Sequence, residues 1–465
     1  MFFSDEDTIA AISTPLGVGG IGIVRLTGKD SVSIVQNLFT PAKQKNLTTL
    51  KTYRVVYGFI TDPFSGETVD EVLVTCMKAP ASYTKEDVVE ISCHGGMTPL
   101  RKTLELVLKS GARLAEPGEF TKRAFLHGRI DLSQAEAVLD LIHSKTDESR
   151  RIAMEQLRGG LSEKITSMRN RLVEVCANIE AHIDFPEDEI ETATYDQVCA
   201  SLQQMKAKLK RLLGTYEEAK FFREGLSTAI VGRPNVGKSS LLNMLLKKDR
   251  AIVTDVPGTT RDVIEEYLNI DGLPLRIMDT AGIRHVEDIA EKEGVRRSLD
   301  SIQRADLVIA MFDRSEALRN DDHDIIKKVM NKNTIIVLNK CDLSSRLDIS
   351  DIRSSITQDW IPILNISATR GDGLDELKAA IVDSCLKDWK EEREGVVISN
   401  IRHKTAIEHT IASLRRAEHL LKESQPLEFL ALELRDALDS LGEIVGVVTK
   451  EDILNKIFSD FCIGK

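Results

Sequence analysis

Apolar and polar residues alternate differently in successive parts of this chain. Residues 1–118 contain short runs rich in Val and Ile, together with one stretch of helical periodicity, which predicts an α+β domain. Strands are expected in GIGIVRLTG (20–28), YRVVYGFI (53–60), EVLVTCM (71–77) and DVVEISC (87–93), and a helix is expected in TPLRKTLELVLKSG (98–111).

The next region is helical. Residues 131–183 have the pattern of one very long helical stretch that is interrupted at Gly159 and Gly160. An acidic segment with a proline, DFPEDEIET (184–192), ends this stretch, and the helical pattern resumes over 194–222. Helical periodicity appears again towards the end of the chain.

The region between the two helical parts alternates continuous apolar runs with helical stretches. The runs are STAIVG (227–232), PLRIMDTAG (274–282), DLVIAMFD (306–313), TIIVLNKCD (334–342) and IPILNISA (361–368). This alternation indicates a mostly parallel sheet covered on both faces. The predicted architecture is an α/β domain (223–386) inserted into an all-α helical domain (119–222 and 387–465) and preceded by the α+β domain (1–118).

The composition is that of an ordinary globular protein. Of the 465 residues, 42% are hydrophobic and 29% are charged, and no apolar stretch approaches the roughly 18 residues that span a bilayer. The start of the chain, MFFSDEDTIA, lacks the features of a cleavable signal, so we expect a cytoplasmic protein without membrane contact. The seven cysteines are scattered and form no CxxC pair, which argues against a disulfide framework and a zinc site.

The charge balance limits the kind of nucleic-acid binding to be expected. A net charge of −11 argues against strong indiscriminate binding, which depends on Lys and Arg. Residues 113–129 are locally rich in cations, with Arg113, Lys122, Arg123 and Arg129 against Glu116 and Glu119. We interpret this segment as a mixed solvated face rather than as a basic binding surface.

The segment GRPNVGKS (232–239) fits the phosphate-binding pattern G-x-x-x-x-G-K-[ST]. It follows an apolar strand and opens a helical run, which is the context that the motif needs. The backbone N–H groups of such a loop surround the phosphates. Lys238 then reaches the β- and γ-phosphates, and the Ser239 hydroxyl coordinates Mg²⁺.

Two further segments are expected to approach the γ-phosphate and Mg²⁺. DTAG (279–282) ends a strand, so Asp279 can hold Mg²⁺ through water and the amide of Gly282 can bond the γ-phosphate. TDVPGTTRD (254–262) lies between the phosphate loop and DTAG as a mobile loop. Its Thr260 is placed to complete the Mg²⁺ shell.

Two more segments predict selection of guanine. NKCD (339–342) ends a strand, and Asp342 can accept two hydrogen bonds from guanine that adenine cannot donate. SAT (367–369) can supply a backbone N–H to the base oxygen. The expected GTP contacts are Asn235, Val236, Gly237, Lys238, Ser239, Ser240, Thr254, Asp255, Val256, Pro257, Gly258, Thr259, Thr260, Asp279, Thr280, Ala281, Gly282, Asn339, Lys340, Asp342, Ser367, Ala368 and Thr369.

The residues that would promote hydrolysis are less obvious. Where Ras-like GTPases carry a water-orienting glutamine after DxxG, this chain has Ile283. Arg261 and Arg284 are candidate arginine fingers, although surface pairing is the preferred interpretation. We hypothesise that Asn235, with backbone carbonyls of 254–259, binds a monovalent cation, which predicts faster hydrolysis in K⁺ than in Na⁺. The candidates for the carboxylate that orients the attacking water are Glu287, Asp288, Glu291 and Glu293.

Three other segments resemble known motifs, but their sequence context argues against the usual function of each motif. GVGGIG (17–22) fits the dinucleotide fingerprint, but it precedes a strand rather than following one, and no helix opens at its third glycine. In CHGG, Cys93 next to His94 suggests a nucleophile or metal pair. Adjacent residues on a strand point to opposite faces, so the two side chains cannot easily act on one atom. The terminal FCIGK (461–465) fails as a prenylation box, whereas Lys465 with its own carboxylate can contact an anionic cofactor.

With these motifs in view, the chain resembles the tRNA-modification GTPase family MnmE, also called TrmE, over essentially its whole length. The stretches DTIAAISTPLGVGGIGIVRLTG, YTKEDVVEISCHGG and PGEFTKRAFLHGRIDLSQAEAV are similar to the N-terminal signatures of that family. The inserted G domain and the C-terminal CIGK are its other marks.

The resemblance implies a function and several ligands. The N-terminal domains would form a homodimer and bind 5-formyl- or methylene-tetrahydrofolate, and the G domains would meet across their switch loops with K⁺ as the charge-neutralising ion. A flavoprotein partner of the MnmG type, which uses FAD, would form a hetero-oligomer with the chain. Together they would install an aminomethyl or carboxymethylaminomethyl group at C5 of the wobble uridine of certain tRNAs.

The resemblance also assigns roles to residues. The implied folate contacts are Arg25, Glu90, Arg129 and Lys465, where lysine is expected in some relatives at the position of Arg129. The implied K⁺ ligands are Asn235, Thr254, Val256 and Thr259. The water-orienting carboxylate becomes Glu291, which acts beside Asn235 and Lys238 as the catalytic set for hydrolysis.

Two alternatives stay open. Cys462 could be a nucleophile that adds to C6 of the uridine, but a small buried thiol that packs the tail is the preferred interpretation. The chain could instead be a regulatory GTP switch or an RNA or ribosome assembly factor without carbon-transfer chemistry. The sequence leaves open which tRNAs are modified and whether glycine or ammonium supplies the nitrogen.

Overall fold

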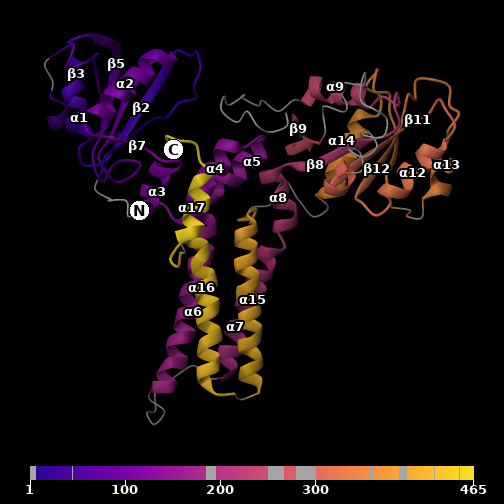
Figure 1. The fold of residues 1–465 in the computed structure, drawn as a ribbon. Coiled ribbons are helices and arrows are strands. Elements are labelled where there is room, and N and C mark those ends of the chain that lie inside the picture. The colour runs from indigo at the N-terminus through magenta and orange to yellow at the C-terminus, as the bar shows by residue number, and fades with distance from the viewer. Residues whose placement is uncertain are drawn as a thin grey trace. The chain divides into compact units, whose positions relative to one another are not determined.

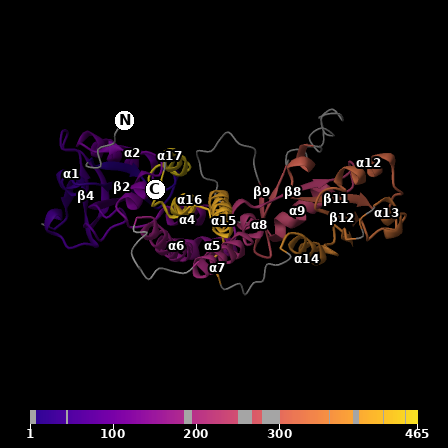
Figure 2. The ribbon, with the colours of Figure 1, turned by 90° about the horizontal axis from the view of Figure 1, so that it is seen from below.

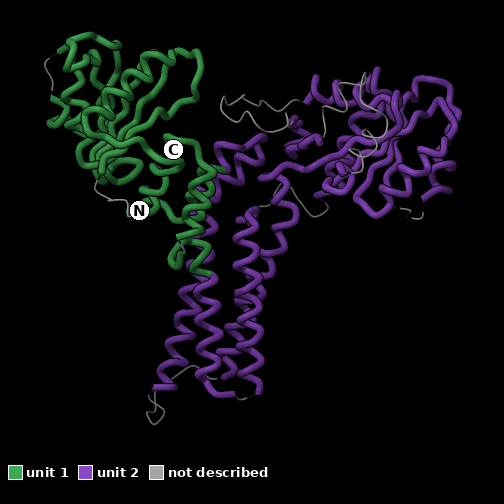
Figure 3. The backbone as a smooth tube through the Cα atoms, in the orientation of Figure 1, with its two compact units in different colours: residues 1–139, 255–261, 441–465 green, residues 140–254, 262–440 purple. Residues whose placement is uncertain are grey.

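The computed structural model describes most of the chain. It covers residues 7–43, 46–184, 195–249, 266–278, 300–356, 358, 360–386, 395–423, 425–449 and 451–465. The described residues fall into two compact units (Figure 3), called unit 1 (7–139 and 441–465) and unit 2 (140–249 and 266–440).

Unit 1 is built on a seven-stranded sheet in the order β3-β4-β5-β6-β2-β1-β7. Neighbouring strands are antiparallel except for β1 and β7, which are parallel. The strands are β1 (Ile9–Ile12), β2 (Ile21–Thr27), β3 (Phe39–Pro41), β4 (Arg54–Thr61), β5 (Thr68–Met77), β6 (Val88–His94) and β7 (Arg113–Leu114). The helices are α1 (Ser31–Leu38), η1 (Leu47–Thr49), α2 (Met97–Lys109), α3 (Glu119–Leu126), α17 (Glu451–Ser459) and the start of α4 (Leu132–His143).

One face of this sheet carries the core of unit 1. Along β4 and β5, buried residues alternate with exposed ones, as the two-residue repeat of a strand requires. The buried side chains of the sheet pack with those of α1 and α2 in one apolar cluster. The predicted strands and helix are therefore present, and β1, β3, β7 and α1 are added to them, while α3 lies in the region predicted to be helical.

Unit 2 contains a six-stranded sheet in the order β13-β12-β11-β8-β10-β9. All neighbours are parallel except β9 and β10, which are antiparallel. The strands are β8 (Leu226–Val231), β9 (Glu266–Ile270), β10 (Leu273–Ile277), β11 (Leu307–Asp313), β12 (Thr334–Asn339) and β13 (Ile363–Asn365). β8 and β12 are buried throughout, because helices cover both faces (Figures 1 and 2).

Helices on the two sides of this sheet belong to different apolar clusters. Leu241 of α9 and Leu377 of α14 pack on one side, whereas Ile326 of α12 and Ile352 of α13 pack on the other. These helices are α9 (Lys238–Asp249), α12 (Asn320–Val329), α13 (Ile349–Ser355) and α14 (Leu374–Cys385). The predicted α/β fold class with a mostly parallel sheet is confirmed.

The remaining helices confirm the all-α part of the prediction. They are α5 (Asp147–Leu157), α6 (Gly160–Asp184), α7 (Tyr195–Leu213), α8 (Tyr216–Glu224), α15 (Ile401–Lys422) and α16 (Leu427–Val445). α7 packs along α15, where Lys206 forms an ion pair with Glu418. α16 is joined to α15 by Arg416 and Glu433, whose charged atoms lie 2.7 Å apart.

Two expectations about local structure are wrong. The single stretch over 131–183 contains a second break before α5, because the Thr146 side chain accepts a hydrogen bond from the Ser149 amide at 3.2 Å and starts a new helix. The GVGGIG segment follows β1 as well as preceding β2, so it is the connection of an antiparallel pair. The segment is still excluded as a dinucleotide-binding site, because a strand and not a helix follows it.

Candidate functional site

The phosphate loop lies between β8 and α9, as the motif requires. Two of its residues have left-handed backbones, with φ of 63° at Asn235 and 104° at Gly237. A Cβ at Gly237 would lie 2.1 Å from Nδ2 of Asn339, so only glycine fits there. Ser239 and Ser240 follow in the first turn of α9.

Lys238 is held inside this loop. Its ammonium donates hydrogen bonds to the carbonyl oxygens of Gly232 at 2.7 Å and Arg233 at 2.8 Å. Burial lowers the pKa of Lys238 to about 8, because the charged form is poorly solvated. An anionic phosphate would restore the ordinary preference for the charged form.

Asn339 joins three of the predicted GTP-binding segments. Its Nδ2 donates to the carbonyl of Val236 at 2.7 Å, and its Oδ1 accepts from the amide of Ala368 at 2.9 Å. Asn339 is buried, so these bonds are shielded from water. The phosphate loop, NKCD and SAT are therefore brought together by hydrogen bonds.

The base-recognition side chains lie around this junction. A hydrogen bond with the Ser367 hydroxyl is the main cause that holds the pKa of Asp342 below its usual value, so the carboxylate stays an acceptor. Ser367 also lies 3.1 Å from the Thr369 hydroxyl. Lys340, with a positive φ of 65°, pairs with Asp313 at the end of β11, with 2.5 Å between Nζ and Oδ2.

Several predicted site residues lie outside the described residues. They are Thr254, Asp255, Val256, Pro257, Gly258, Thr259, Thr260, Asp279, Thr280, Ala281, Gly282, Glu291, and the candidates Arg261, Ile283, Arg284, Glu287, Asp288 and Glu293. Of the predicted cation ligands, Asn235 and Ser239 lie within the described residues, and their side chains carry uncharged oxygen donors. Such donors fit K⁺ and Mg²⁺, which are hard cations.

In unit 1 the end of the chain runs beside residues 117–120. Ile463 forms a β-bridge with Pro117, and the Phe120 amide donates to the carbonyl of Lys465 at 3.2 Å. Gly464 has a φ of 95°, and a Cβ there would lie 2.5 Å from the carbonyl oxygen of Ile12. The tail therefore fits closely against β1 and the start of α3.

This docking places the chain end beside two of the predicted folate residues. Arg25 and Glu90 are paired across β2 and β6, with 2.8 Å between Nη2 and Oε1. Nη1 of Arg25 donates to the carbonyl of Gly464 at 3.3 Å, and its guanidinium lies 5.7 Å from the centre of the Phe120 ring. Burial, followed by the nearby charge of Arg25, lowers the pKa of Lys465.

Two other predicted site residues, Arg129 and Cys462, also belong to unit 1. The Arg129 guanidinium stacks 4.6 Å from the centre of the Tyr83 ring, and Tyr83 packs against the cluster that contains Phe120. The carbonyl of Cys462 accepts from the Gly118 amide at 3.5 Å, while its side chain is exposed. The expectation of a buried thiol that packs the tail is therefore wrong, because apolar packing falls to Phe461.

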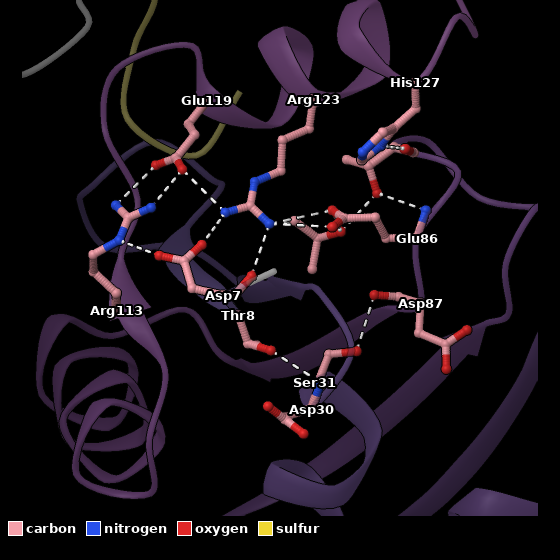
Figure 4. Close-up of polar contacts among 12 residues, drawn as sticks. Asp7, Thr8, Asp30, Ser31, Glu86, Asp87, Arg113, Glu119, Arg123 and His127 are labelled. Carbon is pink, nitrogen blue, oxygen red and sulfur yellow. Dashed lines mark hydrogen bonds and ion pairs between the residues drawn. The ribbon is translucent and has the colours of Figure 1, made fainter. Parts of the chain in front are cut away.

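Buried ion pairs support the same region (Figure 4). Arg123 contacts Asp7 at 2.5 Å, and Glu86 and Glu119 at 3.2 Å, while Arg113 contacts Glu119 at 2.6 Å. Burial opposes ionisation of Glu119, but the hydrogen bond and charge of Arg113 outweigh it and lower its pKa. The expected mixed solvated face is therefore wrong for Arg123 and Glu119, which are buried.

Comparison with known proteins gives the family. The family model "MnmE helical domain" matches residues 132–462, and the model "GTP-binding protein TrmE N-terminus" matches residues 8–129. The tRNA modification GTPase MnmE of Alkaliphilus oremlandii is 46% identical over 99% of this chain and 99% of that protein. The protein of the same name from Acetivibrio thermocellus is 47% identical, again over 99% of both chains.

The chain belongs to the MnmE family of tRNA modification GTPases. It is therefore a GTP hydrolase of that family, and the resemblance read from its motifs is confirmed. Among solved structures, a point variant of Aquifex aeolicus Era bound to GDP·AlF4⁻ aligns at 27% identity with a TM-score of 0.26, over 40% of this chain and 65% of that one.

Some residues of this MnmE-family site escape sequence reasoning. Phe120 and Tyr83 support the two arginines, but single aromatic residues carry no spacing signal. Arg233 lies inside the phosphate motif at a position that the pattern leaves free, so only its contacts show its role.

Within the described residues, no helix is long and apolar enough to cross a membrane.

Proposed function

We propose that this chain is a K⁺-stimulated GTPase that modifies C5 of the wobble uridine in certain tRNAs. It would act as a homodimer in the cytoplasm with a flavoprotein partner of the MnmG type. The added group would be aminomethyl or carboxymethylaminomethyl, with its carbon taken from 5-formyl- or methylene-tetrahydrofolate. The observation that carries the proposal is the docking of the chain end beside Arg25 and Glu90.

The charges at this docking site suit a folate. Arg25, Arg129 and Lys465 supply cations for the carboxylates of the cofactor, and Glu90 accepts hydrogen bonds from its pterin ring. The lowered pKa of Lys465 reflects its burial near another cation, a situation that an anionic ligand relieves. Folate supplies the one-carbon unit when bound.

Cys462 is the proposed nucleophile towards the tRNA base. Its exposed thiol is three residues from Lys465, so it lies near the proposed folate pocket. Addition of the thiolate to C6 of uridine would move an electron pair to C5, and C5 would then form a bond to the methylene carbon carried by tetrahydrofolate. Loss of the C5 proton, departure of tetrahydrofolate as ammonia or glycine bonds to the same carbon, and release of the thiolate from C6 would restore the base. A formyl group would first need two electrons, which the FAD-dependent partner would supply.

In the nucleotide site, each predicted residue has a proposed role. Lys238 binds the β- and γ-phosphates, and Ser239 with Thr260 holds Mg²⁺. Asn235, with Thr254, Val256 and Thr259, holds the K⁺ that neutralises charge in the transition state. Asp342 accepts two guanine hydrogen bonds, and Glu291 orients the attacking water.

An open sheet face supports the homodimer. Tyr57, Leu73, Ser92 and Ile23 form a row of directly paired residues across four strands. Tyr57 is 45% exposed and Leu73 is also 45% exposed, on the side opposite the core of unit 1. Ile23 and Ser92 are partly buried, so the exposed apolar part of the row is the Tyr57–Leu73 pair, and neighbouring exposed apolar side chains are typical of a protein interface.

The folate proposal is tested by calorimetry on the full-length chain. We expect 5-formyltetrahydrofolate to bind, and we expect Arg25→Ala, or removal of Gly464 and Lys465, to weaken binding by at least about tenfold. GTP hydrolysis should be retained in both variants. Arg101→Ala is the control, because Arg101 is exposed on α2 and forms its ion pair with Glu105 of the same helix.

The same titration separates the two functional classes. A regulatory switch or assembly factor needs no folate, so an unaltered chain that hydrolyses GTP but binds no 5-formyltetrahydrofolate would refute the proposal. Equal binding by the shortened and unaltered chains would show that the docked tail takes no part in the pocket.

A further inference from the structure

The second residue of the phosphate loop, Arg233, pairs its guanidinium with two carboxylates that lie outside the loop. Its Nε donates to Oδ1 of Asp322 at 2.7 Å, and its Nη2 lies 3.2 Å from Oε2 of Glu316. Only 9% of Arg233 is exposed. A buried guanidinium needs such partners, because an unpaired charge inside a protein is strongly unfavourable.

Asp322 is a fixed partner. It is the third residue of α12 and only 1% exposed. While Oδ1 binds Arg233, Oδ2 accepts a hydrogen bond from the Arg319 amide at 2.9 Å, which closes the start of the helix. Both carboxylate oxygens are therefore held, one by the loop and one by the start of α12.

Arg233 also touches the lysine of the phosphate loop through its backbone. Its carbonyl accepts the hydrogen bond from Lys238 Nζ at 2.8 Å, beside the bond from Lys238 to Gly232. One residue thus joins α12, through its side chain, to the phosphate-binding lysine, through its backbone. Glu316 is a weaker second anchor, since its side chain is 43% exposed and also pairs with Arg319.

We propose that Arg233 and Asp322 are a positioning pair that keeps the phosphate loop in its nucleotide-binding shape. Neither residue is catalytic, because both act through the loop. If the pair is broken, a buried charge loses its partner, and the start of the loop must open to hydrate it. Apparent nucleotide affinity then falls in proportion to the fraction of molecules whose loop is still competent.

The test is Asp322→Asn in the full-length chain. The asparagine oxygen can still accept from the Arg319 amide, so the helix start is largely kept while the charge is lost. We expect the Kd for GDP and for GTP, measured by fluorescence titration, to rise about tenfold. KM for GTP should rise similarly and kcat should stay within about twofold, since bound nucleotide restores the loop.

A matched control exists on the neighbouring helix. Asp351 is the third residue of α13 and accepts from the Asp348 amide at 2.9 Å, so it has the same capping role without the contact to Arg233. Asp351→Asn should leave both Kd values unchanged. Glu316→Gln should raise them by less than about threefold, because its pairing is exposed.

A second variant keeps the proposal testable if Asp322→Asn folds poorly. Arg233→Lys retains the positive charge but loses the planar guanidinium that reaches two carboxylates at once, so it should also raise the Kd for GDP. In the double variant Arg233→Gln with Asp322→Asn, no unpaired charge remains, and GDP should bind more tightly than to Asp322→Asn alone.

Two results would overturn the proposal. Unchanged nucleotide Kd values in both Asp322→Asn and Arg233→Lys, with only a lower melting temperature, would make the pair purely structural. Equal weakening by Asp322→Asn and Asp351→Asn would assign the effect to helix capping rather than to the phosphate loop.

Discussion

At the scale of single residues, several buried or half-buried arginines of this protein lie beside carboxylates. Arg123 has three carboxylates around it, Arg233 has two, and Arg25 contacts both Glu90 and the carbonyl of Gly464. Lys238 differs, because its described partners are neutral carbonyl oxygens. Burial removes the ammonium of Lys238 from water, so its pKa falls.

This predicts proton uptake when nucleotide binds. The pKa of Lys238 is lowered to about 8, and nearby phosphate should raise it again. At pH 8, binding of GDP should therefore take up about half a proton, and affinity should fall as the pH rises further. Calorimetry in buffers of different ionisation enthalpy measures this number.

At pH 6.5 Lys238 is already charged, so its contribution to uptake should vanish, which provides the control within the same protein. A proton number at pH 8 equal to that at pH 6.5 would contradict the assignment of the lowered pKa to Lys238.

At the scale of elements, the C-terminal tail behaves as an added edge of unit 1. It pairs with the segment before α3, and its apolar member Phe461 packs in a cluster with Phe458 and Leu132. The close approach to β1 depends on the absence of a side chain at Gly464. The positive φ of this residue adds a second reason for glycine.

Gly464→Ala should therefore loosen the tail. The new Cβ would meet the Ile12 carbonyl, which belongs to backbone and cannot move aside easily. We expect hydrogen exchange at the Phe120 amide, which donates to Lys465, to become at least about tenfold faster. Gly19→Ala in the same unit is the control, because nothing lies within 4 Å of its Cβ position.

Unchanged protection of the Phe120 amide in Gly464→Ala would mean that the tail tolerates a side chain. The steric explanation of the glycine would then be wrong.

At the scale of the whole molecule, packing does not follow the point in the sequence where the helical pattern gives way to alternating strands and helices. Part of the predicted helical region packs with the sheet of unit 2. Ile152 of α5 packs in the same apolar cluster as Leu275 of β10. Ser149 donates to the Phe222 carbonyl at 2.6 Å, and Lys145 lies 5.2 Å from the centre of the Tyr267 ring. A helix far upstream in the sequence thus completes one edge of unit 2.

Ile152→Ala should destabilise the sheet of unit 2, although Ile152 precedes its first strand by more than 70 residues. Removing a buried isoleucine side chain typically costs about 2–4 kcal/mol of unfolding free energy. Hydrogen exchange of the β10 and β11 amides in denaturant measures the loss.

Arg150→Ala, on an exposed position of the same helix, should change that free energy by less than about 0.5 kcal/mol. Similar losses in the two variants would show that α5 affects the sheet through its helical stability and not through the packing of Ile152.

The sequence by itself determined the local features. Spacing in GRPNVGKS, NKCD and SAT predicted the nucleotide loops, and apolar periodicity predicted both sheets and most helices, because these patterns arise within a few turns or strands. The break at Thr146 and the exposure of Cys462 were missed, since each depends on a single side chain in its surroundings.

Only the tertiary structure decided which distant residues meet. Arg25 and Gly464 are separated by 439 positions, and Arg233 and Asp322 by 89, yet each pair is in contact. No periodicity in a chain encodes such pairs, because they depend on where whole elements pack. Burial then turns ordinary surface charges into partners whose loss leaves a charge without solvent or counter-ion.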